Sequence, residues 1–330
     1  MRDERVTAAV DWARDVLGPV ELHRLRSRPW AVTWRLTRPG HADAFLKCAT
    51  ARTGHEAVVL PVLTRACPAL VPELLATDPA GHRLIVASAG TVLREREGDT
   101  FRLEVWIPLV QRFAELQRSL TSYVETLLEQ GVPDERPHRY LDLLRPFTTA
   151  EQVPADERNR LATLAAGWER PTVPHRLRLR EVPPVLKAPL VPPSLQHGDL
   201  HDNNVAVDEA GAYRFFDFGD SCVAHPFSTM DLPLMFAAEG VDAAGVARLE
   251  DAYLEVFTDL APLAQLRTEL RAVLALAPLH RALSWLRALS PDEAATGSEV
   301  VWDPVAAAEW EEPILYWLAQ LRTQGRMPRT

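Results

Sequence analysis

The stretch LQHGDLHDNNVAVDEAGAYRFFDFGD, residues 195–220, decides the fold because it places two polar motifs on either side of a short apolar hairpin. The runs VAV and AYRFF predict two strands joined by the turn DEAG. Closing this hairpin brings its open ends together, so we expect Asn204 and Asp217 to lie side by side, with Asp199 on the loop leading in. Two carboxylates and an amide oxygen at one strand end suit Mg²⁺, which usually also carries substrate phosphates.

The spacing within this stretch follows the catalytic loop and the metal-binding triplet of kinases. HGD at 197–199, with Asn204 five residues after the aspartate, has the pattern H-x-D-x-x-x-x-N. DFG at 217–219 then stands where the metal-binding triplet belongs. Together with MDL at 230–232, the stretch resembles the aminoglycoside phosphotransferase and choline kinase-like family of small-molecule kinases.

The resemblance implies a bilobal α+β fold of the protein-kinase type. An N-terminal five-stranded antiparallel sheet with one helix would form a nucleotide-binding lobe over residues 1–88, and a larger, mainly α-helical lobe over 89–330 would carry catalysis and acceptor binding. The pattern along the chain agrees with this order, since five strand-like runs and one helical run precede the helices. The strand-like runs are 20–25, 31–36, 43–48, 71–77 and 82–87, and the helical runs include 1–18, 54–67, 105–120, 246–257 and 313–321.

Lysine usage singles out one position in the N-terminal half. Of the 36 Lys and Arg residues, only Lys47 and Lys187 are lysine, so a lysine hints at a place that needs a compact ammonium. Lys47 lies on the third predicted strand and Glu56 on the helix that follows. The resemblance implies that Lys47 holds the nucleotide's α- and β-phosphates and that Glu56 orients it. It also implies that the backbone near Ala87 to Ala89 meets the adenine edge.

The same resemblance assigns roles within the opening stretch. Asp199 would accept the proton of the acceptor hydroxyl and aim its oxygen at the phosphorus, while Asn204 and Asp217 would hold Mg²⁺. His197 would support the loop by packing, and Asp231 would pin the loop backbone from a helix N-terminus. Residues that could line the acceptor cleft are His201, Asp202 and Asp220.

Two features depart from the family pattern. The loop between the first two strands, RSRPWA at 26–31, lacks the glycines of protein kinases, which bears on its nucleotide contacts. The helix motif that usually ends in Leu-His reads ELQRS here, with Gln117 in the histidine's place, a position we expect to be structural. The segment 170–194 holds seven prolines and predicts an extended surface connection rather than a domain boundary.

Composition excludes several classes of function. The net charge of -9 argues against nucleic acid as a partner, and no apolar run approaches the ~20 residues of a membrane span. The N-terminus is charged from the start, unlike a signal peptide. Cys48, Cys67 and Cys222 form no metal-spaced cluster, so we expect a reducing cytoplasm. The sequence predicts no oligomeric state.

These features predict an ATP- or GTP-dependent, Mg²⁺-requiring phosphotransferase that acts on a hydroxyl of a small molecule. The acceptor stays open among an aminoglycoside, another antibiotic, an amino sugar and an amino alcohol. The alternative is a non-catalytic kinase-fold protein that binds nucleotide or regulates. GDLHDNN also faintly echoes metallophosphoesterase loops, but the Asp-x-His and Gly-Asn-His tripeptides of those enzymes are missing.

Charge in the C-terminal part suggests a cationic or amine-bearing acceptor. Residues 241–320 contain thirteen Asp or Glu against five Arg and no Lys. An acidic cleft would raise the local concentration of such a substrate. The patch at 290–312 stands out, because its acids flank Trp302 and Trp310, whereas solvated helix faces are the plain alternative.

Overall fold

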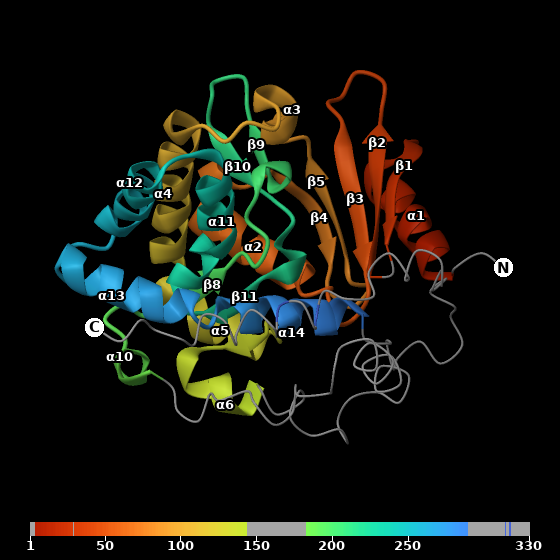
Figure 1. Cartoon of the computed structure of the whole chain (residues 1–330). Coiled ribbons are helices and arrows are strands. Elements are labelled where there is room, and N and C mark those ends of the chain that lie inside the picture. The colour runs from red at the N-terminus through yellow and green to blue at the C-terminus, as the bar shows by residue number, and fades with distance from the viewer. Residues whose placement is uncertain (1–3, 29, 144–182, 290–313, 315–316, 318–330) are drawn as a thin grey trace, which may run out of the picture.

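The chain forms a five-stranded antiparallel sheet followed by a mainly helical part (Figure 1). The strand order is β1-β2-β3-β5-β4, and the predicted α+β class with one helix after the third strand is confirmed. This computed structural model describes residues 4–28, 30–143, 183–289, 314 and 317. The sheet consists of β1 (Glu21–Arg28), β2 (Ala31–Thr37), β3 (Ala44–Ala49), β4 (Leu74–Asp78) and β5 (Arg83–Ala87), with α1 (Glu4–Leu17) before it and α2 (Glu56–Ala66) between β3 and β4.

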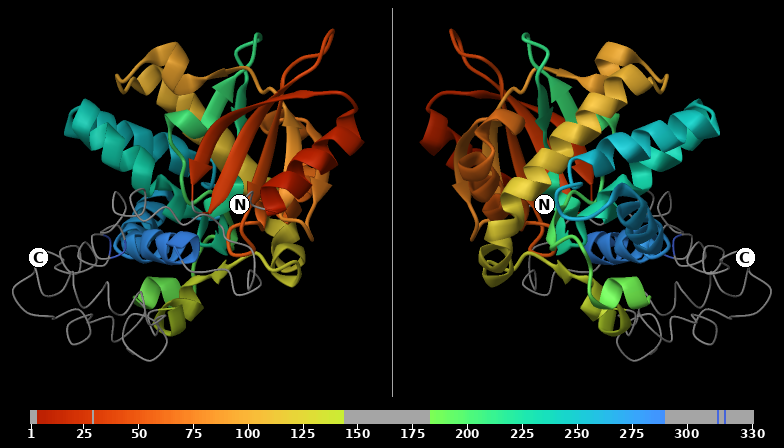
Figure 2. Two further views of the ribbon diagram at one scale, coloured as in Figure 1. Left: turned by 90° about the vertical axis from the view of Figure 1, so that its right-hand side faces the viewer. Right: turned by 90° about the vertical axis from the view of Figure 1, so that its left-hand side faces the viewer.

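Helix α1 covers one face of this sheet (Figure 2). Side chains alternate along a strand, so Trp34 and Leu36 of β2 and Leu46 of β3 all point to the same face. There they pack against Ala9 and Ala13, which are fully buried on the helix. The small alanines let the helix approach the sheet closely, and the opposite face of β3 is left to the site described below.

The chain changes sheets just after β5. β6 (Thr91–Val92) pairs with β9 (Val205–Val207) of a second, three-stranded sheet, instead of extending the first one. The predicted lobe boundary between residues 88 and 89 falls at this change and stays a prediction. The core is continuous across it, because Leu63 of α2 and Phe113 of α4 (Leu103–Leu120) belong to one cluster of buried residues.

The remaining elements form the helical part, where the helical runs predicted at 105–120 and 246–257 correspond to α4 and α12. The run predicted at 313–321 lies outside the described residues except for Ile314 and Trp317. Among the described helices, none is long and apolar enough to cross a membrane. The other elements are α3 (Leu93–Glu97), α5 (Val124–Glu129), β7 (Asp134–Glu135), α6 (Tyr140–Leu143), α10 (Pro184–Lys187), β8 (Ser194–Gln196), β10 (Tyr213–Phe215), β11 (Cys222–Ala224), α11 (Asp231–Gly240), α12 (Ala243–Glu255), α13 (Leu263–Leu274) and α14 (Ala277–Leu289).

The proline-rich segment differs from its prediction where it is described. Residues 183–194 contain the short helix α10, and Leu186 and Val191 are each only 1% exposed. The prediction of a plain surface connection is therefore wrong for this end of the segment. The many prolines of this segment suggested an exposed connection, but Leu186 and Val191, which lie between them, belong to the buried core.

A buried carboxylate on α13 fixes this segment. Glu269 is fully buried and accepts hydrogen bonds from the backbone N–H groups of Leu190 and Val191, at 2.7 and 3.1 Å. It also accepts one from Nε2 of His225, at 2.8 Å. Burial lowers the pKa of His225, and Glu269 opposes this without reversing it, so the imidazole is neutral at pH 7. One carboxylate thus satisfies three donors, two of which are buried.

We predict that Glu269→Ala lowers the free energy of unfolding by roughly 3 kcal/mol or more, because each buried donor left unsatisfied costs about 1–3 kcal/mol. Urea unfolding measures the change. Glu255→Ala, which removes an exposed carboxylate from α12, serves as the control and should change stability by less than about 0.5 kcal/mol. Equal midpoints for the two variants would contradict a structural role for Glu269.

Candidate active site

The β9–β10 hairpin brings the two polar motifs together. Val205 pairs with Phe215, and beyond this pair the N–H of Phe216 donates to the carbonyl of Asn204, at 3.1 Å. Asn204 and Asp217 therefore flank the same end of the hairpin. Asp217 has φ 65° and ψ 61°, a left-handed conformation that Asp tolerates better than most residues and that turns the chain sharply after the strand.

A buried lysine joins three distant segments at this end. Lys47 alternates with Leu46 on β3, so it points away from α1 and toward α2. Its Nζ lies 2.6 Å from Oε2 of Glu56 and forms a second ion pair with Asp217. Glu56 also accepts the N–H of Phe218 on Oε1, at 2.8 Å. Burial opposes the charge on Lys47, but Asp217 and Glu56 outweigh it and raise the pKa of the ammonium above its ordinary value.

Asp199 is held on both of its carboxylate oxygens. Oδ1 accepts from Nη1 of Arg281 at 2.9 Å, and Oδ2 lies 3.2 Å from both Nε2 of His201 and Nδ2 of Asn204. Burial alone would raise the pKa of Asp199, but His201 and Arg281 hold it well below the usual range. The side chain keeps 26% exposure. A carboxylate has about four lone-pair sites, so Asp199 can still accept a hydrogen bond from a ligand hydroxyl.

His197 lies beneath the loop and is fully buried. Its Nε2–H donates to the carbonyl of Phe216 at 3.0 Å, and its Nδ1 accepts the N–H of Asp199 at 3.3 Å. Its ring also lies 4.7 Å from that of Phe218, centroid to centroid. Burial lowers the pKa of His197 to about 4, so the ring is neutral at pH 7. Through these contacts, His197 connects the loop to the turn that follows β10.

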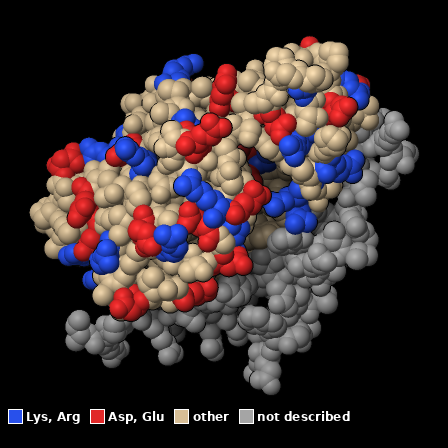
Figure 3. Space-filling model, turned by 90° about the horizontal axis from the view of Figure 1, so that it is seen from above, with Lys and Arg blue, Asp and Glu red and all other residues tan. Residues whose placement is uncertain are grey.

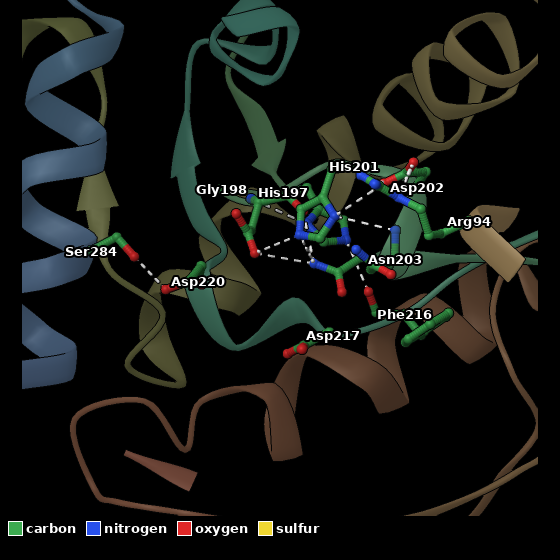
Figure 4. A network of polar contacts seen from close by, with 12 residues as sticks. Arg94, His197, Gly198, His201, Asp202, Asn203, Phe216, Asp217, Asp220 and Ser284 are labelled. Carbon is green, nitrogen blue, oxygen red and sulfur yellow. Dashed lines mark hydrogen bonds and ion pairs between the residues drawn. The ribbon is translucent and has the colours of Figure 1, made fainter. Parts of the chain in front are cut away.

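The three residues predicted for the acceptor cleft are held by neighbours (Figure 4). Asp202 forms an ion pair with Arg94 of α3, with Nε 2.6 Å from Oδ2. Asp220 accepts a hydrogen bond from Ser284 of α14. Burial would lower the pKa of His201, but hydrogen bonds to two loop aspartates outweigh it and raise the pKa to about 9.

Arg281 and Thr229 contact the loop backbone, whereas the contact predicted for Asp231 stays a prediction. Asp231 is the first residue of α11, yet its Oδ2 is buried without a hydrogen-bond partner among the described residues. Burial raises the pKa of this carboxyl to about 6. The carbonyl of Gly198 instead accepts from Arg281, and the N–H of His197 lies 3.4 Å from Oγ1 of Thr229. No local sequence pattern marks Arg281, which lies more than 80 residues after the loop.

Gln117 takes a structural place beside the loop. It is fully buried, and its Nε2 donates to the carbonyls of Leu195 and Pro226 at 3.0 and 2.9 Å. Its Oε1 accepts from the hydroxyl of Tyr253 at 2.6 Å. The amide therefore ties the strand that enters the loop to the segment that follows β11.

Comparisons with known proteins show the family and the fold. The model of the phosphotransferase enzyme family matches residues 31–266. No curated protein matches the chain. A *Plasmodium vivax* ethanolamine kinase is 13% identical, with a TM-score of 0.58 over 96% of this chain and 85% of its own.

Two antibiotic-modifying enzymes are also similar in structure. Macrolide 2'-phosphotransferase MphH from *Brachybacterium faecium* is 14% identical, with a TM-score of 0.53 over 88% of this chain and 99% of its own. A thermostable mutant of aminoglycoside phosphotransferase APH(4)-Ia, in ternary complex with AMP-PNP and hygromycin B, is 13% identical, with a TM-score of 0.55 over 97% of this chain and 98% of its own. At these identities the likeness shows the kinase-like fold. The family match covers well over half of the chain, so the chain belongs to the phosphotransferase enzyme family and is a small-molecule kinase.

Proposed function

We propose that this kinase transfers the γ-phosphoryl group of ATP or GTP to a hydroxyl of a small molecule, with Mg²⁺ as cofactor. One observation carries the proposal: the Lys47–Glu56–Asp217 ion cluster lies at the same hairpin end as the pair of Asp199 and Asn204. Phosphoryl transfer depends mainly on such positioning and on neutralising charge. The kinase-like neighbour solved with AMP-PNP supports ATP as the donor.

On the nucleotide side, Lys47 would hold the phosphates and Glu56 would keep it aimed into the cleft. The adenine would meet the backbone after β5. The N–H of Ala87 already donates to the backbone carbonyl of Glu73, and the N–H of Ser88 to the backbone carbonyl of Asp43, each at 2.9 Å. The adenine contact that the sequence places at Ala87 to Ala89 therefore falls on Ala89 or on carbonyl oxygens.

The residues at the hairpin end fit a magnesium ion. Asp217 uses Oδ1 for Lys47, and its side chain is 38% exposed, so its other oxygen is available to a ligand. Asn204 directs Nδ2 to the carbonyl of Asp199, so its amide oxygen is not used in that contact. One carboxylate and one amide oxygen are typical protein ligands of Mg²⁺, whose remaining positions go to phosphates and water. When bound, the ion would neutralise charge on the phosphates.

Asp199 would orient the acceptor. Its open lone pairs would accept the acceptor hydroxyl, whose oxygen then forms the new bond to the γ-phosphorus while the bond to the leaving diphosphate oxygen breaks. The hydroxyl proton passes to Asp199 and from there to solvent. Because Arg281 and His201 hold the pKa of this carboxyl low, it is a weak base that aligns the hydroxyl first and takes the proton late in the step.

We also propose a cationic or amine-bearing acceptor, although the acids of residues 241–320 are not what supports it. Seven of the thirteen acids in 241–320 lie outside the described residues. Among the described ones, Glu269 is buried and Asp259 pairs with Arg118. On the face seen in Figure 3, acidic and basic side chains are interspersed rather than gathered by sign. The acidic residues that could attract a cationic acceptor are Asp199, Asp220 and Asp231, which lie near Arg281.

The cysteines fit the expected cytoplasmic location. None of the three forms a disulfide, and all three are buried. A reducing compartment would keep them so.

We predict that Lys47→Ala loses most of its affinity for AMP-PNP with Mg²⁺ and that Lys47→Arg does not restore it. The Nζ lies between two carboxylates. Gly219 lies so close to it that a Cβ added there would be only 3.1 Å from the Nζ. The wider, planar guanidinium of arginine therefore does not fit this place. Isothermal titration measures the affinities. Lys187→Arg, at the exposed second lysine, is the control. A Lys47→Arg protein with parental affinity would show that no compact ammonium is needed.

We predict that Asp199→Asn lowers kcat about 10²–10⁴-fold while AMP-PNP affinity survives, because Asp199 contacts the acceptor hydroxyl rather than the nucleotide. The assay is a nucleotide-consumption screen over hydroxylated antibiotics, sugars and amino alcohols, followed by the variants on each acceptor found. Asp11→Asn, on the exposed side of α1, is the control. Failure of every acceptor, with intact nucleotide binding, would favour the non-catalytic alternative.

We predict that kcat/KM for a cationic acceptor such as choline or ethanolamine falls as ionic strength rises and falls again in Asp220→Asn. Burial and the neighbouring Asp199 raise the pKa of Asp220, so the assay is run over a series of rising pH, which favours the ionised carboxylate. A neutral sugar alcohol is the control, and its kcat/KM should change with neither. If kcat/KM for the best acceptor does not change with ionic strength, the proposal of a cationic acceptor is contradicted, whereas the proposed kinase reaction is not.

A further inference from the structure

One face of α14 reaches three separate parts of the site. Arg281, Ser284 and Trp285 stand at spacings of three and four residues, so they share a side of the helix. Arg281 contacts the loop that carries Asp199, and Ser284 donates to Asp220, just after the metal-binding triplet. The third residue, Trp285, packs on the loop between β1 and β2.

The contact of Trp285 is with Trp30. The two rings meet edge to face, with centroids 5.6 Å apart. Trp30 lies in the turn that takes the place of the glycine-rich loop of protein kinases, so α14 touches the nucleotide side of the site as well. The carbonyl of Trp30 accepts from the N–H of Thr50 and from Oγ1 of Thr53, both at 3.0 Å, which fixes this turn against the end of β3.

The guanidinium of Arg281 is itself held in place. Its side chain is 13% exposed, and its Nη1 bridges the carbonyl of Gly198 and Oδ1 of Asp199. The ring of Trp317 lies over the guanidinium carbon at 5.3 Å from its centroid, a cation–π contact. A rigid, planar donor that grips a carbonyl and the following carboxylate fixes both the loop backbone and the rotamer of the aspartate.

On this basis we propose that Arg281 is a positioning residue for phosphoryl transfer: from α14 it sets the orientation of the Asp199 carboxylate toward the acceptor hydroxyl. The inference rests on the proposed function, because it needs Asp199 to act on that hydroxyl. Ser284 does the same for the turn at Asp220, so α14 holds both halves of the site in register. A misplacement of about 1 Å between reacting groups can cost roughly 10²-fold in rate, so the loss of this grip is expected in kcat.

The test uses the full chain and the best acceptor from the screen. Arg281→Ala is expected to lower kcat about 10–100-fold, to change the acceptor KM less than about threefold, and to leave AMP-PNP affinity and Tm near the parental values. Arg281→Lys keeps the charge, and because both contacts come from the single nitrogen Nη1, a lysine ammonium at the same place should recover part of kcat. Arg271→Ala, on the exposed side of α13, is the matched control and should behave as the parent.

Chemical rescue separates positioning from folding. Methylguanidinium at about 10–50 mM should restore part of kcat in Arg281→Ala and none in Asp199→Asn, while urea at the same concentration should restore none. A normal kcat in Arg281→Ala, or a loss confined to the acceptor KM, would overturn the inference while Asp199→Asn still upholds the kinase reaction. The absence of any turnover in the parent would instead overturn the proposed function.

Discussion

The ion cluster of Lys47, Glu56 and Asp217 is the constraint on which the rest of the site depends. It ties β3, α2 and the turn after β10 at one point, although Asp217 lies 170 residues from Lys47 in the chain. A buried ammonium is costly without partners, and two carboxylates without a cation would repel each other. Each member therefore requires the other two. The sheet and the hairpin must close on each other for the three groups to meet.

A second set of contacts holds the loop that carries Asp199. His197 braces it from below through Phe216, and Gln117 holds the strand that leads into it. Arg281 grips it from the side of α14. These groups use neutral hydrogen bonds beneath the loop and one charged contact at its surface. The hydrogen bonds of His197 and Gln117 thus add no charge beneath the loop, while the carboxylate stays accessible.

The parts of the site that sequence could predict are those fixed by local geometry. The turn DEAG and the apolar runs on either side of it set the register of the hairpin, and this was enough to place Asn204 beside Asp217. Lys47 was visible because lysine is rare in this chain and because a strand alternates its side chains. Arg281 and Arg94 had no such signal, since tertiary packing alone brings them to the loop. The contact predicted for Asp231 from a motif match stays a prediction, and its buried Oδ2 has no hydrogen-bond partner among the described residues.

The charges of the site form pairs from different elements, and this bears on how a nucleotide would enter. Lys47 pairs with Asp217, Arg281 with Asp199, and Arg94 with Asp202. A bound phosphate would compete with Asp217 for Lys47, just as a metal would compete with Lys47 for Asp217. Binding of the nucleotide together with its metal would therefore give both side chains a new partner, and neither charge would be left uncompensated. In the proposed function, the pairs of Arg281 and Arg94 would not be exchanged in this way, because neither Asp199 nor Asp202 would hold the metal. The nucleotide side could then rearrange while the acceptor side stays fixed. Transfer to an oriented hydroxyl needs this division, because the reacting oxygen must already be aligned when the phosphate arrives.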